Sequence, residues 1–249
     1  PYRNLWTSSA ELTRSFKGIR PAMLNAVGRK IPEHVVGYGA VKPYAGAFAN
    51  LGFVTRAPVK LVCAVPGKGK VLHDIRAALE SVGLKDGATI SFHHHLRNVD
   101  HVLNAVLGEI ARMGLQDITV AANSLFQVHA PLVEHIWHGV VTRIATAYMS
   151  GPIAHAVSRG LLTKPVILQT HGGRARAIES GELHIDVEYV GAPSADAYGN
   201  VNGVAGRSAC GSLGYSMADV QCADRVVAIT DNLVPYPAFL IAISQDFVD

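Results

Sequence analysis

A repeated alternation of apolar runs and helix-like stretches constrains the fold of this chain more than any other feature. Between residues 73 and 230, apolar positions recur at helical spacing, then form a short uninterrupted run, and the two patterns keep alternating. Short apolar strands between helices are typical of a parallel sheet that is covered on both faces. The sequence therefore predicts an α/β fold with an open, mostly parallel sheet and helices on both faces. The expected helices are residues 75–82, 99–110, 132–138, 153–159 and 175–180, and the expected strands are residues 88–92, 118–122, 142–147, 166–169, 185–190 and 226–230.

The first 70 residues do not share this alternation. Glycine and proline recur there every few residues, with short apolar pieces between them, and both residues break regular structure. We therefore expect an extended N-terminal arm at residues 1–70 and one α/β domain at residues 71–249. The chain begins with proline and ends without a helix-ending or turn signal, so both ends are expected to be cut from a longer chain.

Composition excludes several classes of protein. The net charge is only +3, and the basic residues are scattered, so the chain lacks the basic stripe of a nucleic-acid binder. No apolar run approaches the roughly 18 to 20 residues that a membrane span needs, and we expect no membrane association. The cysteines Cys63, Cys210 and Cys222 form no CxxC pair and are odd in number, which argues against a disulfide framework. We expect a cytoplasmic protein.

Polar residues collect directly after the predicted strands. Ligands of open parallel sheets bind at the edge formed by the carboxyl ends of the strands. Arg97 can grip a carboxylate through two parallel hydrogen bonds, and neutral histidines can donate without adding a full charge, although a solvated loop is the competing interpretation. We expect a carboxylate-rich substrate to bind there. The candidate contacts are His93, His94, His95, Arg97, Asn98, Asn123 and Ser124.

Two glycine-containing turns leave alternatives open. Gly172 and Gly173 open a helical stretch directly after a strand, so their amides can face an anion at a helix N-terminus. An ordinary tight turn is the competing interpretation, because glycine is the default residue for such bends. Asp196, Asn200 and Gly203 crowd a later turn, which by composition is only a tight loop.

The run of histidines at residues 93–95 invites a metal-site interpretation that its spacing does not support. Successive residues of a strand point to opposite faces, so three in a row do not converge on one ion without a sharp bend. His135 and His138 share a helix face, but the paired-histidine zinc helix has its histidines four residues apart and needs a third ligand. We therefore predict no metal site.

Several ungapped motifs are spread along almost the whole chain. They are NAVGRKIPE at residues 25–33, SFHHHLR at 91–97, HAPLVEH at 129–135, GVVTR at 139–143, HGGR at 171–174, SGELHID at 180–186 and CGSLGY at 210–215. With these motifs the chain resembles the alpha chains of citrate lyase. More distantly, residues 86–87, 194–201 and 231–235 resemble the first domain of coenzyme A transferases in general.

The resemblance implies a fold and a reaction. It implies the open α/β sheet shared by NagB, RpiA and the coenzyme A transferases. The implied activity is that of a citrate CoA-transferase, which exchanges acetyl for citryl on the thiol of an acyl carrier protein. That thiol belongs to a coenzyme-A-like prosthetic group, a dephospho-CoA derivative, on the carrier rather than on this chain. The implied partners are citrate, an acetyl thioester, and the beta (lyase) and gamma (acyl carrier) chains of an oligomeric complex.

The resemblance also implies roles for residues. The prosthetic group is expected at His171, Gly172, Gly173, Pro193, Ser194, Asp196, Asn200 and Gly203. The loop after the first strand is rich in glycine in other members, whereas histidines stand at residues 93–95, so side-chain donors are the alternative to backbone amides. The catalytic residue is expected in a second α/β domain outside residues 1–249. No glutamate here matches the nucleophile of other coenzyme A transferases, and Glu182 and Glu188 are interpreted as structural.

Three other functions compete, because a fold does not determine a function. The first is another coenzyme A transferase or a thioesterase of the same fold. The second is a sugar-phosphate isomerase that holds phosphate at Gly172 and Gly173, although no catalytic acid-base pair is visible. The third is a non-catalytic assembly domain, which the glycine- and proline-rich arm would suit.

Overall fold

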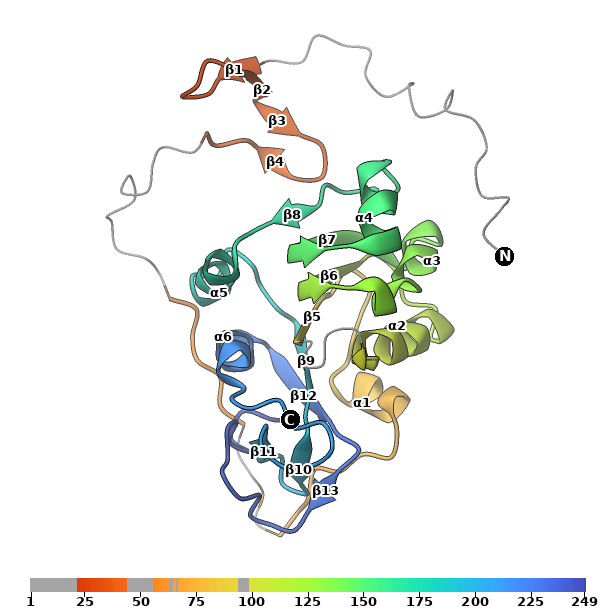
Figure 1. Cartoon of the computed structure of the whole chain (residues 1–249), viewed down its shortest axis with the longest axis vertical. Coiled ribbons are helices and arrows are strands. Elements are labelled where there is room, and N and C mark those ends of the chain that lie inside the picture. The colour runs from red at the N-terminus through yellow and green to blue at the C-terminus, as the bar shows by residue number, and fades with distance from the viewer. Residues whose placement is uncertain (1–21, 44–55, 63–64, 66, 94–98) are drawn as a thin grey trace. The chain divides into compact units, whose positions relative to one another are not determined.

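The computed structural model describes residues 22–43, 56–62, 65, 67–93 and 99–249. The chain divides into two compact units, one of residues 1–52 with 163–165 and the other of residues 53–162 with 166–249. The larger unit carries the predicted alternation of strands and helices (Figure 1).

The described part of the smaller unit contains two short antiparallel pairs. They are β1 (Ala22–Leu24) with β2 (Lys30–Pro32), and β3 (His34–Val35) with β4 (Gly39–Ala40). In the first turn, the side chain of Asn25 accepts hydrogen bonds from the amides of Val27 and Arg29. Gly28 takes a left-handed φ of 74° there, which glycine adopts without steric cost. The glycine and proline pattern of the sequence indicated the turns of this region but did not predict its two strand pairs.

The larger unit is built on a six-stranded sheet in which every neighbouring pair of strands is parallel. Its order is β12-β9-β5-β6-β7-β8. The strands are β5 (Thr89–His93), β6 (Ile118–Leu125), β7 (Val141–Met149), β8 (Ile167–Leu168), β9 (Val187–Gly191) and β12 (Arg225–Ile229). This arrangement confirms the predicted fold class.

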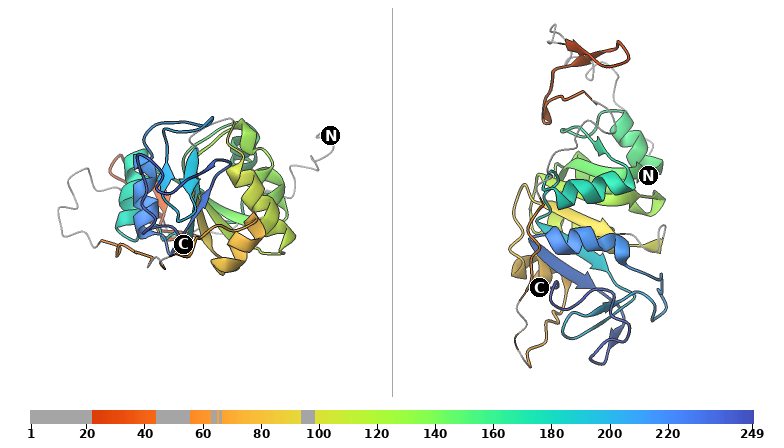
Figure 2. Two further views of the ribbon diagram at one scale, coloured as in Figure 1. Left: turned by 90° about the horizontal axis from the view of Figure 1, so that it is seen from below. Right: turned by 90° about the vertical axis from the view of Figure 1, so that its left-hand side faces the viewer.

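Helices cover both faces of this sheet. One face packs against α1 (Ile75–Ser81), α2 (Val102–Arg112), α3 (Leu132–Trp137) and α4 (Gly151–Ser158). The other packs against α5 (His171–Glu179) and α6 (Met217–Cys222), which lie in front of the sheet in the right-hand view of Figure 2. Ile90 and Phe92 of β5 belong to the first core, so Ser91 and His93 point to the α5 and α6 side.

Local signals explain where several helices begin and end. The carboxylate of Asp74 accepts the amide of Ala77 at 2.8 Å and so caps α1. Gly114, with φ 77°, follows α2 in the left-handed conformation that commonly ends a helix. The sequence did not predict α6.

A second, smaller sheet continues from the carboxyl end of β9. Its order is β11 (Val201–Asn202), β10 (Ser194–Asp196), β13 (Leu233–Val234). These strands of two or three residues were not predicted, since they lie among polar, glycine and proline residues and no apolar run marks them. Within the described residues, no helix combines the length and the apolar character needed to cross a membrane.

Candidate active site

Several of the predicted substrate contacts lie together at the edge of the large sheet formed by the carboxyl ends of its strands. Because β5, β6, β7 and β8 are parallel, His93, Asn123, Ser124 and the start of α5 all lie at this edge. Ser91 is in register with residue 121, so two residues further on His93 and Asn123 occupy neighbouring positions on one face. The side-chain oxygen of Asn123 is buried without a hydrogen-bond partner among the described residues. His94, His95, Arg97 and Asn98 lie outside the described residues.

The N-terminus of α5 forms another part of this edge. Thr170 caps the helix, because its hydroxyl oxygen accepts the amide of Gly173 at 3.0 Å. A Cβ at residue 173 would lie 2.8 Å from that oxygen, so glycine is needed for the cap. This amide is therefore engaged within the chain, as in an ordinary capped turn. His171 and Gly172 are exposed on the same turn.

The other residues predicted to contact the prosthetic group lie in or beside the small sheet, and several of them make hydrogen bonds within the chain. The carboxylate of Asp196 accepts hydrogen bonds from the amides of Tyr198, Asn200 and Ala238 and from the side chain of Asn200. Burial raises the pKa of Asp196, but these hydrogen bonds together lower it by a larger amount, so the net shift is downward. A Cβ at Gly203 would lie 2.0 Å from a backbone oxygen, so this glycine permits a close approach of two segments.

Pro193 and Ser194 are the other two residues of this region that were predicted to contact the prosthetic group. The carbonyl of Pro193 accepts the side-chain amide of Asn232 at 3.3 Å. Ser194 is fully buried, and its hydroxyl has no hydrogen-bond partner among the described residues. Both follow the carboxyl end of β9, so this group lies beyond the same edge of the large sheet.

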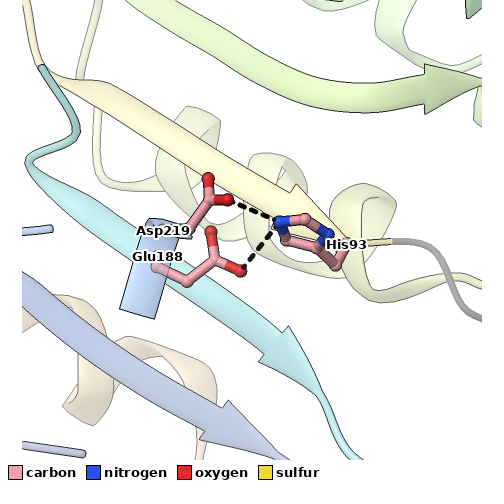
Figure 3. Close-up of side chains that lie close together, drawn as sticks. All are labelled: His93, Glu188 and Asp219. Carbon is pink, nitrogen blue, oxygen red and sulfur yellow. Dashed lines mark hydrogen bonds and ion pairs between the residues drawn. The ribbon is translucent and has the colours of Figure 1, made fainter. Parts of the chain in front are cut away.

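A network of buried polar side chains, hereafter the buried network, lies between the sheet and helices α5 and α6. It contains Ser91 and His93 of β5, Glu188 of β9, Arg174 of α5 and Asp219 of α6, and each is at most 3% exposed. Figure 3 shows the two carboxylates directed at the same nitrogen of His93. Of these residues, only His93 was among the predicted contacts.

Asp219 is the centre of the buried network. Arg174 donates to it from both terminal nitrogens, at 2.9 Å to Oδ2 and 2.7 Å to Oδ1. The hydroxyl of Ser91 donates to Oδ1 at 2.5 Å, and Nε2 of His93 lies 2.7 Å from Oδ2. Arg174 also donates to the Ser91 hydroxyl and to the carbonyl of Ala121. Because an ionised carboxylate only accepts, His93 must carry a hydrogen on Nε2.

Glu188 makes fewer contacts within the buried network than Asp219 does. Its Oε1 lies 4.0 Å from Nε2 of His93, and neither carboxyl oxygen has a hydrogen-bond partner of good geometry among the described residues. Burial and then Asp219 raise the pKa of Glu188 to about 7, against the opposing effects of His93 and Arg174. The Ser91 hydroxyl also lowers this pKa, although its hydrogen is directed at Asp219. Glu188 therefore retains a proton more readily than an ordinary glutamate.

The other members respond to the same charges. Burial alone would raise the pKa of Asp219, but Arg174 and then His93 lower it well below its usual range. Burial lowers the pKa of His93, whereas Glu188 and Asp219 raise it, and the net shift is upward. Asp219 and Arg174 thus stay charged, while His93 and Glu188 compete for a proton.

Ligand atoms of His93, Glu188 and Asp219 lie within 4.8 Å of one another, as metal ligands do. The guanidinium of Arg174 already contacts both oxygens of Asp219, however, and a metal ion would have to sit beside this fixed positive charge. We therefore assign no metal ion to this cluster.

A second cluster of potential metal ligands lies elsewhere in the described residues. It consists of His184, Asp186 and Asp224, which precede β9 and β12 and so lie at the amino edge of the sheet. It is largely exposed, and Lys60 lies 3.3 Å from Asp224. We assign no metal ion to this cluster either.

Tyr215 connects the buried network with the exposed rim. It belongs to the short helix η4 (Gly214–Ser216), and its ring centroid lies 5.7 Å from that of His93 and 5.5 Å from that of His171. Tyr215 is 38% exposed, so it covers His93 while facing solvent itself. Tyr215 belongs to the family motif at residues 210–215 but was not among the predicted contacts.

One missed residue did leave a signal in the sequence. Glu188 is the single charged residue inside the apolar part of β9, where a buried strand normally carries none. Arg174 and Asp219 left no comparable signal, since charged residues are ordinary on short helices. Their importance follows only from their contact with each other.

A sequence profile described as citrate lyase, alpha subunit, matches residues 68–249, which include the whole buried network. The chain belongs to the citrate lyase alpha subunit family. This confirms the resemblance inferred from the motifs.

Curated members of the family are longer than this chain. The citrate lyase alpha chain of Escherichia coli K12 is 49% identical over 180 residues, which are 72% of this chain and 35% of that protein. The alpha chain of Klebsiella pneumoniae is 42% identical over 207 residues, which are 83% of this chain and 40% of that protein. The chain thus spans about a third to two fifths of the length of these citrate lyase alpha chains.

Solved structures agree with this family. A citrate lyase alpha subunit from Streptococcus mutans, solved in complex with citrate, has a TM-score of 0.82 and 46% identity, and the match covers 90% of this chain and 44% of that chain. An acyl-CoA transferase from E. coli O157:H7 has a TM-score of 0.55 and 10% identity, and the match covers 76% of this chain and 48% of that one. The second likeness shows the shared fold alone.

Proposed function

We propose that this member of the citrate lyase alpha subunit family supplies one wall of a citrate CoA-transferase site. The observation that carries the proposal is the similarity to the Streptococcus mutans structure, which is a complex with citrate and is 46% identical over 90% of this chain. The polar carboxyl edge, with His93 and Asn123 side by side, is the proposed location.

The proposed reaction exchanges acetyl for citryl on the thiol of the carrier. A citrate carboxylate attacks the carbonyl of the acetyl thioester, so that a C–O bond forms, the C–S bond breaks, and a mixed anhydride and a thiolate result. The thiolate then attacks the citryl carbonyl of the anhydride, and acetate leaves with the electrons of the C–O bond. The chain would position two anions and stabilise the oxyanions that develop.

The residues divide into two proposed groups. His93, His94, His95, Arg97, Asn98, Asn123 and Ser124 would face citrate. His171, Gly172, Gly173, Pro193, Ser194, Asp196, Asn200 and Gly203 would face the prosthetic group. In the second group the internal hydrogen bonds of Asp196 favour a supporting role, whereas His171 is exposed and available for contact.

The partners are part of the same proposal. The prosthetic group would be the dephospho-CoA derivative of a gamma chain, and a beta chain would cleave the citryl thioester to acetyl thioester and oxaloacetate. An oligomeric complex of these chains in the cytoplasm would contain residues 1–70 as an arm and residues 71–249 as the first of two α/β domains.

The test uses the full-length chain with an acyl carrier that bears an acetylated prosthetic group. We expect acetate release that depends on citrate and forms citryl carrier in equal amount. Acetate release without citrate would instead identify a thioesterase. Faster transfer to another carboxylic acid in a substrate panel would identify a different coenzyme A transferase. A carrier that stays acetylated in the presence of citrate would contradict the proposal.

A further inference from the structure

The buried network joins the elements that carry the proposed contacts. His93 is the last residue of β5, directly before residues 94–98. Arg174 lies three residues after His171, on the first turn of α5. Asp219 of α6 binds both of them. A change within the buried network would therefore be transmitted to the end of β5 and to the start of α5 together.

The buried network has a definite charge balance. Arg174 and Asp219 form an ion pair and cancel each other. His93 and Glu188 remain, and Nε2 of His93, whose hydrogen Asp219 accepts, lies 4.0 Å from Oε1 of Glu188. The proton that titrates on this pair is therefore either on Nδ1 of His93 or on the carboxyl group of Glu188. One proton on this pair leaves the network neutral, whether the pair is imidazolium with carboxylate or imidazole with carboxylic acid. Loss of that proton leaves a net negative charge, and uptake of a second proton leaves a net positive one.

Among the described residues, few other charged groups face His93 and Glu188. On β5 the neighbouring polar group is the neutral Ser91, and on β12 the residue in register with Glu188 is the apolar Val226. On η4 the facing group is the phenol of Tyr215, which also contacts the exposed His171. Within the described residues, α5 and α6 contribute Arg174 and Asp219, which are already paired.

We propose that His93 and Glu188 are positioning residues that share one proton, and that the neutral network they complete holds the end of β5 and the start of α5 in the geometry of the transferase site. This inference rests on the proposed function. A net charge buried between the sheet and two helices is unfavourable, and it is relieved when the helices move or water enters. Either change displaces the edge at which citrate and the carrier would meet.

The test compares Glu188→Gln with Glu182→Gln in the full-length chain, assayed with the acetylated carrier and citrate across a range of pH. Glu182 makes an exposed ion pair with Arg176 and serves as the matched control. In the wild type, kcat/KM for citrate should fall about tenfold per pH unit once the shared proton is lost. Glu188→Gln keeps the network neutral without that proton, so this alkaline fall should disappear. Activity should instead fall at acid pH, where protonation of His93 gives the buried network a net positive charge.

His93→Gln provides a second variant. Glu188 can still ionise in this variant, so the fall in kcat/KM at alkaline pH should persist. It should move to lower pH, because the shared proton has lost one of the two groups that can hold it. Circular dichroism at each pH separates these shifts from unfolding. If Glu188→Gln does not fold, the shift in His93→Gln decides the question, and an unshifted profile there overturns the inference.

The outcomes separate the inference from the function it rests on. A wild type without citrate-dependent turnover overturns the proposed function and the positioning role together. A working wild type with the same pH profile in Glu188→Gln and Glu182→Gln overturns the positioning role alone. Loss of the alkaline fall in Glu188→Gln, with the control unchanged, supports it.

Discussion

Arg174 on α5 and Asp219 on α6 form a two-pronged ion pair in which both side chains are at most 1% exposed. The pair joins the two helices that cover one face of the sheet, although the residues are 45 positions apart in the chain. Removing one partner of such a pair leaves an uncompensated buried charge, so its loss is far more costly than loss of a surface pair.

Asp219→Asn should therefore destabilise the fold strongly. We expect a loss of about 3 to 5 kcal/mol in the free energy of unfolding, measured by urea titration. The control is Glu182→Gln, which makes the same change from acid to amide in a two-pronged pair with Arg176 that is exposed. That variant should lose at most about 1 kcal/mol. Equal losses would show that burial of the Arg174 pair is unimportant.

The stability of the protein should depend on the proton of Glu188. Its pKa is about 7 in the folded chain and 4.5 in the reference state, so the folded state binds the proton more tightly. This stabilisation is complete below pH 4.5 and is lost as the pH rises towards about 7. The fall in unfolding free energy should be on the order of 2 to 4 kcal/mol.

Glu188→Gln should flatten this part of the pH dependence, because glutamine does not titrate. Urea unfolding of the wild type and the variant at a series of pH values provides the measurement. The exposed Glu182→Gln serves again as the control and should follow the wild type. A variant curve as steep as that of the wild type would assign the pH dependence to other groups.

Asp196→Asn should weaken the small sheet. Oδ2 of Asp196 accepts the Ala238 amide and the Asn200 side chain, and Oδ1 accepts the amides of Tyr198 and Asn200. In asparagine an NH2 group replaces one of these two oxygens, so in either orientation two donors face another donor. We expect a loss of about 1 to 3 kcal/mol in unfolding free energy. Asp246→Asn, at an exposed aspartate, should be nearly neutral. If Asp196→Asn lost affinity for the carrier without losing stability, Asp196 would be a direct contact.

Arg97→Ala should weaken the use of citrate more than the use of the carrier. Loss of a charge-assisted hydrogen bond costs about 1.5 to 3 kcal/mol, which is roughly a ten- to hundredfold fall in kcat/KM for citrate. Steady-state kinetics of the full-length enzyme, with each substrate varied in turn, provide the measurement. Arg29→Ala, at an exposed position of the smaller unit, is the control. Unchanged citrate kinetics would remove Arg97 from the proposed site.

The large sheet was predictable because its signal is local. An apolar run such as residues 118–122 identifies β6 whatever its partners are. The prediction ended that strand three residues early, since Asn123 and Ser124 are polar and only their neighbours in β7 keep them in the sheet. The small sheet was missed because its short strands lie among polar, glycine and proline residues, so no apolar run marks them.

The sequence by itself determined the alternation of strands and helices, and through it the edge at which polar residues such as His93 and Asn123 come together. Its motifs also determined the family. The tertiary structure alone decided that Arg174, Glu188 and Asp219 meet beside His93. The reason is physical: burial and charge pairing act through space between four elements that are distant in the chain. An aspartate on a short helix, such as Asp219, has the same local pattern whether water or an arginine surrounds it.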